Sequence, residues 1–240
     1  WSEIGGLSET KDILEKVIID PINNSEDSVL PKGIMLYGPP GSGKTMIAKA
    51  LANTSGMNFI SIKGPELLSK YLGESEQLIK NYFNKARQVS PSILFFDEID
   101  SICSINYDGS TDSVTSRMLS QLLLELDGFS ELSNVVILAA TNKINKIDKS
   151  LLRSGRFDLL LETPLPSEDE ILEILKIKIN DKEIVFNNIK SLIQKISNFN
   201  GADLDTMLNL AIQFCNGKQL NSKGVDKAID EISKRKKIIS

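Results

Sequence analysis

The sequence predicts an α/β fold, in which helices cover both faces of a parallel sheet, followed by a small all-helical lid domain. Two observations lead to this prediction. Short apolar runs alternate with segments of helical periodicity as far as Pro164, and beyond it strand-like runs stop. Right-handed crossovers between parallel strands place helices on both sides of a sheet. We therefore expect a large α/β domain over residues 1–164 and a helical domain over residues 165–240.

The first elements lead up to a central strand. A helix is predicted to begin at Ser8, a suitable N-cap, and to end at Pro21, because proline lacks the N–H that continues a helix. Residues 23–28 are polar and indicate a surface loop. The apolar run over residues 33–37 then predicts a buried strand.

A phosphate-binding loop follows this strand, with the sequence Gly-Pro-Pro-Gly-Ser-Gly-Lys-Thr over residues 38–45. Its glycines let successive backbone N–H groups point into one concavity, and the following helix adds the positive end of its dipole. We expect Lys44 to reach the β- and γ-phosphates of a nucleotide, and the Thr45 hydroxyl to bind Mg²⁺. The alternative is a Gly- and Pro-rich turn without a ligand, which the flanking strand and helix disfavour.

An interrupted helical region follows a second strand, which is predicted over residues 57–62. A short helix begins near Glu66, and helical periodicity resumes at Glu74. Between them lie Lys70, Tyr71 and Leu72. This break favours no single interpretation from its spacing, because its tyrosine can equally well fold back onto the core.

The next buried strand, residues 92–96, ends in two acids, Asp97 and Glu98. The carboxyl ends of parallel strands open onto the ligand crevice of such sheets. Asp97 suits the surroundings of Mg²⁺, and Glu98 suits polarising a water for attack on a γ-phosphate. An acid that merely caps a helix is the alternative, which the phosphate loop upstream makes less favourable.

A second polar strand end is predicted at Asn142. A short helix over residues 99–103 and a polar segment over 104–112 precede a leucine-rich helix that stops at Asp127 and Gly128. The strand over residues 135–140 then ends in Thr141 and Asn142, at the same edge of the sheet as Asp97. Asn142 is either a turn residue or a donor to the attacking water or the γ-phosphate.

The last part of the chain changes character. Arg153 and Arg156 flank Gly155, a pattern that is commonly solvated surface, and a strand is predicted over residues 159–161. Amphipathic helices are then predicted over residues 167–180, 188–198, 201–216 and 223–237. The basic run over residues 234–237 is interpreted as a solvated helix end that complements the helix dipole.

Composition excludes several classes of protein. The chain is 41% hydrophobic and 25% charged with a net charge of −4, so it has no general attraction for nucleic acid or anionic lipid. Its apolar runs are shorter than the roughly 20 residues that span a bilayer, which predicts a soluble protein. Two cysteines in unrelated segments favour a reducing compartment, and we expect the cytoplasm or the nucleus. The chain has no histidine, which excludes His-based triads, and Cys103 and Cys215 are expected to be free thiols because their spacing fits no metal site.

With these motifs in order, the chain resembles the AAA family of ATPases, within the AAA+ group, over essentially its whole length. It is most similar to the second ATPase module of the valosin-containing protein, or cell division cycle protein 48, class and its ribosome-biogenesis relatives. The motifs that carry the resemblance are the Walker A loop 38–45, the Walker B acids Asp97 and Glu98, Thr141-Asn142, Arg153-Ser-Gly-Arg156, and the segments 63–68, 73–76 and 200–204.

The resemblance implies roles for individual residues. ATP or ADP with Mg²⁺ would be held by Lys44 and Thr45, with Asp97 at the metal, and Asn142 would sense the γ-phosphate. Arg153 and Arg156 would act as arginine fingers on a neighbouring subunit's nucleotide. The remaining nucleotide contacts would come from Ile4, Gly5, Pro40, Gly41, Ser42, Gly43, Met46, Ile174, Gly201 and Ala202.

The resemblance also implies an activity for the assembled protein. ATP hydrolysis in a homo-hexameric ring would thread polypeptide through a central pore lined by Lys70, Tyr71 and Leu72, with protein substrates and adaptors and without direct nucleic-acid binding. The alternatives are a ribosome-maturation or other assembly-remodelling ATPase, a structural nucleotide-binding ring and a nucleic-acid translocase. Because the chain begins at the first residues of the module, we expect it to be a piece of a longer protein.

Overall fold

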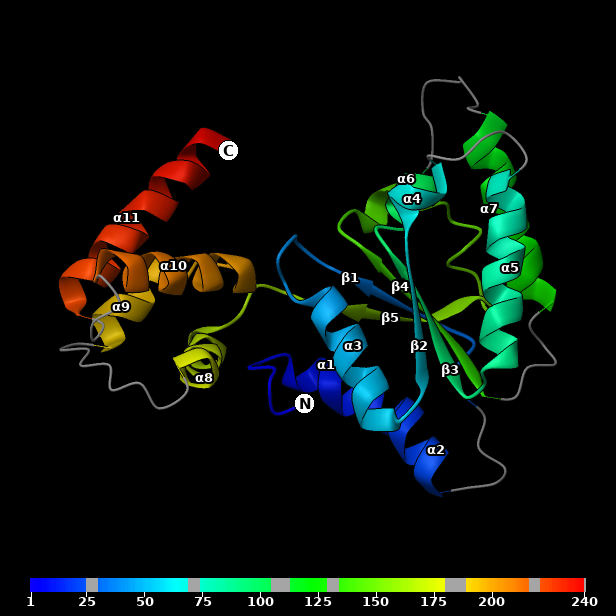
Figure 1. The fold of residues 1–240 in the computed structure, drawn as a ribbon, viewed down its shortest axis with the longest axis horizontal. Helices are drawn as coiled ribbons and strands as arrows, with labels where there is room; N and C mark the ends of the chain where they lie inside the picture. Colours follow the sequence, from blue (N-terminus) through cyan, green and yellow to red (C-terminus); the bar gives the residue numbers. More distant parts are fainter. Residues whose placement is uncertain are drawn as a thin grey trace. The chain divides into compact units, whose positions relative to one another are not determined.

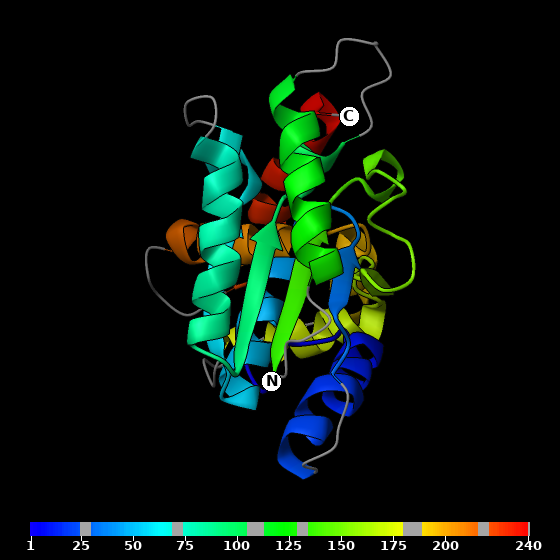
Figure 2. The same ribbon diagram turned by 90° about the vertical axis from the view of Figure 1, so that its right-hand side faces the viewer.

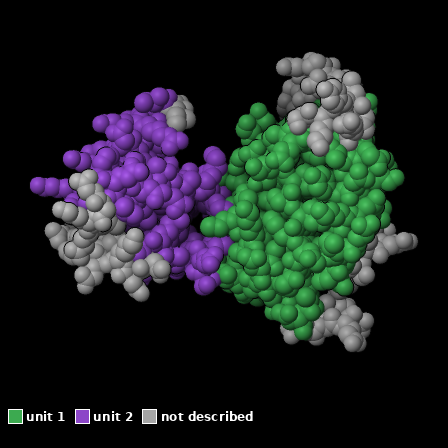
Figure 3. Space-filling view, in the orientation of Figure 1, with its two compact units in different colours: residues 1, 9–39, 44–163 green, residues 2–8, 40–43, 164–240 purple. Residues whose placement is uncertain are grey.

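The computed structural model describes residues 1–24, 30–68, 74–104, 113–128, 134–179, 189–215 and 221–239 (Figure 1). The chain forms two compact units, which Figure 3 colours separately. The first contains residues 1, 9–39 and 44–163, and the second contains residues 2–8, 40–43 and 164–240. Hydrophobic periodicity gives no sign that residues 2–8 and 40–43 group with the C-terminal helices.

The first unit is built on a five-stranded sheet in the order β2-β3-β4-β1-β5. Its strands are β1 (Gly33–Tyr37), β2 (Asn58–Lys63), β3 (Ser92–Asp97), β4 (Val135–Thr141) and β5 (Phe157–Glu162). Every pair of neighbouring strands is parallel. Strands β1, β3 and β4 are almost entirely buried, which explains why they read as continuous apolar runs instead of alternating ones. The predicted parallel α/β architecture is confirmed.

Helices cover both faces of this sheet. They are α1 (Ser8–Leu14), α2 (Asp20–Asn24), α3 (Lys44–Ser55), α4 (Gly64–Leu68), α5 (Glu74–Gln88), α6 (Asp100–Cys103) and α7 (Ser113–Asp127). Helix α3 lies on one face, and α5 and α7 lie side by side on the other (Figures 1 and 2). The β1-to-β2 crossover therefore lies on the opposite face from the next two, because the chain reverses its direction along the sheet after β2.

The predicted end of the first helix at Pro21 is wrong. Helical structure continues through a π-helical segment, Glu15–Ile19, into α2, and Pro21 is the second residue of that helix. The Asp20 N–H bonds to the Glu15 carbonyl five residues back, which widens the turn just before the proline. Pro21 therefore lies within continuous helical structure, although its nitrogen carries no hydrogen to donate.

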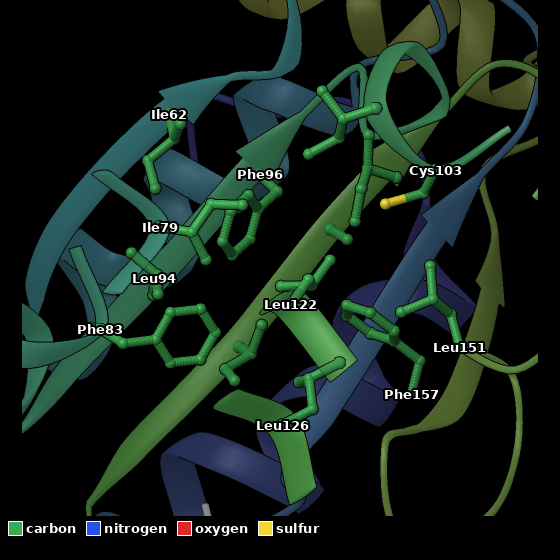
Figure 4. Packing of buried hydrophobic residues seen from close by; sticks show 14 of the residues in the cluster. Ile62, Ile79, Phe83, Leu94, Phe96, Cys103, Leu122, Leu126, Leu151 and Phe157 are labelled. Atoms are coloured by element: carbon green, nitrogen blue, oxygen red, sulfur yellow. The ribbon is translucent and has the colours of Figure 1, made fainter. Parts of the chain in front are cut away.

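The main hydrophobic core lies between the sheet and the two helices α5 and α7 (Figure 4). Phe83 of α5 packs against Phe96 of β3 with ring centroids 6.1 Å apart, and Leu122 of α7 is fully buried beside them. Each such side chain contributes about 1.5–3 kcal/mol when fully buried. The strand that ends in Asp97 is therefore held rigidly, which is what a site at its end needs.

The part of the second unit that the structure describes after β5 contains four helices: α8 (Glu168–Ile179), α9 (Ile189–Ile196), α10 (Gly201–Phe214) and α11 (Ser222–Ile239). They match the predicted helices closely and share one apolar core, with Ile171, Ile196, Met207 and Ala228 fully buried, one from each helix. Among the described residues, none of the helices has both the length and the apolar character to cross a bilayer.

Candidate functional site

The polar strand ends meet at the carboxyl edge of the sheet. Tyr37, the last residue of β1, lies beside Thr141, the last of β4, and β4 in turn pairs with β3, which ends in Asp97. The Tyr37 carbonyl accepts hydrogen bonds from the N–H (2.7 Å) and hydroxyl (3.1 Å) of Thr163. A side chain on Gly38 would collide with the Thr163 carbonyl, so only glycine fits where the loop leaves the strand.

Lys44 is buried at the first turn of α3, and its ammonium group contacts the loop that precedes it. Its Nζ donates to the carbonyl oxygens of Gly38 (2.9 Å) and Pro39 (2.8 Å). Burial lowers the pKa of Lys44, while the negative charges of Asp97 and Asp100 act in the opposite direction. The cation is therefore held in place by neutral carbonyls and nearby carboxylates, in a setting that an anionic ligand would stabilise.

The Thr45 hydroxyl and the Asp97 carboxylate are in direct contact. Thr45 Oγ1 donates to Asp97 Oδ2 over 2.8 Å. The described residues contain no group of three or more Cys, Asp or Glu side chains that could cage a metal ion. A hydroxyl beside one carboxylate is instead the donor set for a Mg²⁺ that keeps water and phosphate oxygens as its other ligands. The residues present therefore fit this ion.

Glu98 has an unusual backbone conformation. Its φ is 53°, in the left-handed region, which costs a residue with a side chain about 1–2 kcal/mol. Its carbonyl accepts from the N–H (3.0 Å) and the hydroxyl (2.9 Å) of Ser101. A Cβ on Gly64 would lie 2.5 Å from the same carbonyl. These contacts hold the strained turn, and the Glu98 side chain is exposed at the strand end.

Asn142 follows a well-anchored threonine. The buried Thr141 hydroxyl donates to Asp100 Oδ1 (2.8 Å) and accepts from the Lys143 N–H (2.9 Å). The Ile99 N–H bonds to the Ala140 carbonyl, so the two strand ends are tied together directly after Glu98. Asn142 itself is exposed at this edge.

Arg156 forms a two-point ion pair within the chain. Its Nε and Nη2 donate to the two oxygens of Asp127, each over 2.8 Å, and its Nη1 donates to the Ser150 carbonyl over 2.5 Å. The bond from Arg156 holds the pKa of Asp127 below its usual value, and the carboxylate raises the pKa of Arg156. Arg153 is exposed. To act on the nucleotide of another subunit, the Arg156 guanidinium group would have to release Asp127 and bind phosphate oxygens in its place.

In the second unit, the N-terminal segment lies against α8. A Cβ on Gly5 would lie 2.6 Å from the Ile174 N atom, so the backbones touch at a glycine. The Gly6 N–H donates to Glu173 Oε2 (3.0 Å), and the Leu7 N–H donates to Glu170 Oε1 (2.7 Å). Gly5 and Ile174, both predicted to line an adenine pocket, are thus brought together, and Ile4 beside them is buried.

The middle of the phosphate loop, residues 40–43, also belongs to the second unit and lies against the start of α10. A Cβ on Gly41, where φ is 75°, would lie 2.8 Å from the Asn200 side-chain amide, and one on Gly201 would lie 3.1 Å from the Gly41 carbonyl oxygen. Ser42 is buried, Gly43 has a φ of 93°, and Ala202 and Met46 are exposed.

Several residues contact the predicted site residues or their neighbours, and these contacts were not predicted. They are Gly64, Ser101, Asp127, Glu170, Glu173 and Asn200. The pattern Asn200-x-x-Asp203 could have indicated a helix cap, but no spacing indicates a partner 160 residues away in the sequence. Lys70, Tyr71 and Leu72 lie outside the described residues, so their predicted place in a pore stays a prediction.

Comparison with known proteins gives consistent matches. The family model for the ATPase family associated with various cellular activities (AAA) matches residues 34–165. Protein SAV of Sulfolobus acidocaldarius is 44% identical over 88% of the chain, and the cell division cycle protein 48 homolog of Archaeoglobus fulgidus is 45% identical over 86%. The human ATPase family gene 2 protein homolog A is 45% identical over 85%. The chain spans 28%, 29% and 24% of the lengths of these three relatives.

Proposed function

Because the chain belongs to the AAA family of ATPases, we propose that it binds Mg²⁺ and ATP at the carboxyl edge of its sheet and hydrolyses the bond between the β- and γ-phosphates. The observation that carries this proposal is the 2.8 Å contact between Thr45 Oγ1 and Asp97 Oδ2, which joins the phosphate loop to the acidic strand end. A hydroxyl and a carboxylate so placed are suited to one Mg²⁺ shared with phosphate oxygens. Mg²⁺ would neutralise charge on the phosphates as they separate.

In this mechanism, Lys44 exchanges the Gly38 and Pro39 carbonyls for phosphate oxygens when a nucleotide binds. Glu98 accepts the proton of a water that attacks the γ-phosphorus in line, and ADP leaves. The fixed turn at Glu98 keeps its carboxylate at the strand end without reorganisation. Asn142 holds the attacking water or a γ-phosphate oxygen by hydrogen bonds.

The first test replaces Glu98 by Gln, which keeps the shape of the side chain and removes its basicity. We expect ATP to bind with an affinity within about threefold of wild type, and turnover to fall by about 10²–10⁴-fold, the usual contribution of a general base. Phosphate release and equilibrium ATP binding are measured on the 240-residue chain. The control is Glu162→Gln, the same change at the exposed end of β5. Turnover that survives in Glu98→Gln would show that another group is the base.

Assembly and work on substrates form the finer part of the proposal. The similarity to relatives named cell division cycle protein 48 homolog and ATPase family gene 2 protein supports a ring-forming module of that class. In such a ring, Arg153 and Arg156 would act on a neighbour's nucleotide, and Tyr71 would grip polypeptide in the pore. Unfolding or remodelling of protein complexes in the cytoplasm or nucleus would be the outcome.

A further inference from the structure

The side chain of Asn200, the residue that caps α10, makes two different hydrogen bonds. Its Oδ1 accepts from the Asp203 N–H over 2.7 Å, and the Asp203 carboxylate accepts from the Asn200 N–H over 3.1 Å, which together form a capping box. Its Nδ2 donates to the Pro40 carbonyl, in the phosphate loop, over 3.0 Å. The helix cap and the loop contact therefore use opposite ends of one amide.

These two partners settle the orientation of the Asn200 amide. The Asp203 N–H is a donor and the Pro40 carbonyl is an acceptor, so only one of the two amide orientations satisfies both. Ser, Thr, Asp and Asn are all good N-caps because each offers an acceptor oxygen. Among them, only Asn adds an N–H donor on a rigid plane beside that oxygen. Capping alone therefore does not explain asparagine at this position.

The hydrogen bond to the Pro40 carbonyl determines where the N–H of the same peptide group, that of Gly41, points. In a planar trans peptide the C=O and N–H groups point in opposite directions. Because the Pro40 carbonyl is directed at Asn200, the Gly41 N–H points away from α10. The Gly41 carbonyl likewise lies against Gly201, so the Ser42 N–H points away as well. Two successive N–H groups are thus aimed to one side, which is how a backbone anion site is built.

We propose that Asn200 is a positioning residue that presets the phosphate loop for nucleotide, by holding the Pro40 carbonyl on the α10 side of the loop. This inference rests on the proposed function, in which the loop binds the phosphates of ATP. A loop that is already in its binding conformation loses less entropy when the ligand arrives. Nucleotide affinity therefore depends on a side chain that need not touch the nucleotide.

The cap is itself held from the last helix. Lys236 of α11 donates from its Nζ to Asp203 Oδ2 (2.7 Å) and to the Asn198 carbonyl (2.6 Å). The same ammonium group lies 5.1 Å from the centre of the buried Phe199 ring. Lys236 thus fixes the carboxylate that completes the capping box and the backbone just before it, so the Asn200 amide has little freedom to turn.

The test compares Asn200→Ser and Asn200→Asp with wild type by titration with a fluorescent ADP analogue and by its dissociation rate. Both variants keep a capping oxygen, so thermal unfolding without nucleotide should stay close to wild type. Serine lacks the donor to Pro40, and we expect affinity to fall about three- to tenfold. Aspartate places an oxygen against the Pro40 carbonyl, and we expect a loss of about tenfold or more, with faster dissociation.

The matched control is Asn221→Asp. Asn221 precedes α11, and its Oδ1 accepts from the Gly224 N–H over 2.9 Å, so the change adds the same charge at another helix cap. Affinity in this control should match wild type. If it falls as far as in Asn200→Asp, charge and not the Pro40 bond is responsible, and the proposal is overturned.

The remaining outcomes separate this inference from the proposed function. If wild type binds the ADP analogue and both Asn200 variants bind it equally well, the positioning role is overturned and nucleotide binding stands. If wild type binds no nucleotide, both proposals fail together. Should Asn200→Asp unfold, Asn200→Ser decides alone, because serine keeps a capping oxygen and adds no charge.

Discussion

At the scale of single residues, the charge of Lys44 depends on the groups around its ammonium group. Lys44 is buried, it donates to two loop carbonyls, and its pKa is lowered by that burial. Burying a charge is costly, and the phosphates of a nucleotide would add to the compensation that Asp97 and Asp100 already provide. The position requires a compact ammonium group and not merely a positive charge.

We therefore predict that Lys44→Arg loses function although it keeps the charge. The longer planar guanidinium group cannot place one donor between the Gly38 and Pro39 carbonyls, so it should disturb the loop. ATP affinity is expected to fall about tenfold or more. Isothermal titration measures this, with Lys49→Arg at an exposed position of the same helix as the control. Wild-type affinity in Lys44→Arg would contradict the prediction.

At the scale of elements, the short helix α4 is joined to the turn that carries Glu98. Gly64, its first residue, lies against the Glu98 carbonyl and the Ser101 side chain. The buried Ser75 hydroxyl of α5 donates to the Leu67 carbonyl over 2.8 Å and so fixes the other end of α4. Helix α4 is therefore held at both ends, with the Glu98 turn at its start.

We predict that Gly64→Ala slows turnover about 10- to 100-fold while ATP affinity stays within about threefold of wild type. A Cβ would lie 2.5 Å from the Glu98 carbonyl and must displace that turn, and small misplacements of a catalytic group have effects of this size. Steady-state hydrolysis and ATP binding are measured together. Gly128→Ala is the control, because a Cβ there meets no heavy atom within 4 Å. Normal turnover in Gly64→Ala would separate α4 from the catalytic turn.

The sequence predicted elements better than it predicted the contacts between them. Apolar runs and helical periodicity report burial, and burial is what determines these strands and helices. The pairing of Thr45 with Asp97 follows once the loop and the acids are recognised at one sheet edge. The bonds Asn200–Pro40 and Arg156–Asp127 could not be predicted, because they depend on how distant segments pack and not on local spacing. At Pro21, the local signal for a helix end was overridden by a wider turn.

At the scale of the whole molecule, Arg156 raises the question of assembly. It is held by Asp127 and the Ser150 carbonyl within its own chain, with 18% of its side chain exposed. A guanidinium group that is always charged and partly exposed is able to exchange one anion for another. In an assembly, the nucleotide of a neighbouring subunit would be that second anion.

The most direct test is ATP turnover per molecule over a wide range of protein concentration, with Arg156→Ala alongside wild type. We expect wild-type turnover per molecule to rise with concentration, and that of Arg156→Ala to stay low and flat. Arg87→Ala, which removes an ion pair with Glu125, is the control for the loss of a surface pair and should behave as wild type. Turnover that is independent of concentration and unaffected by Arg156→Ala would contradict a hydrolytic site completed between subunits.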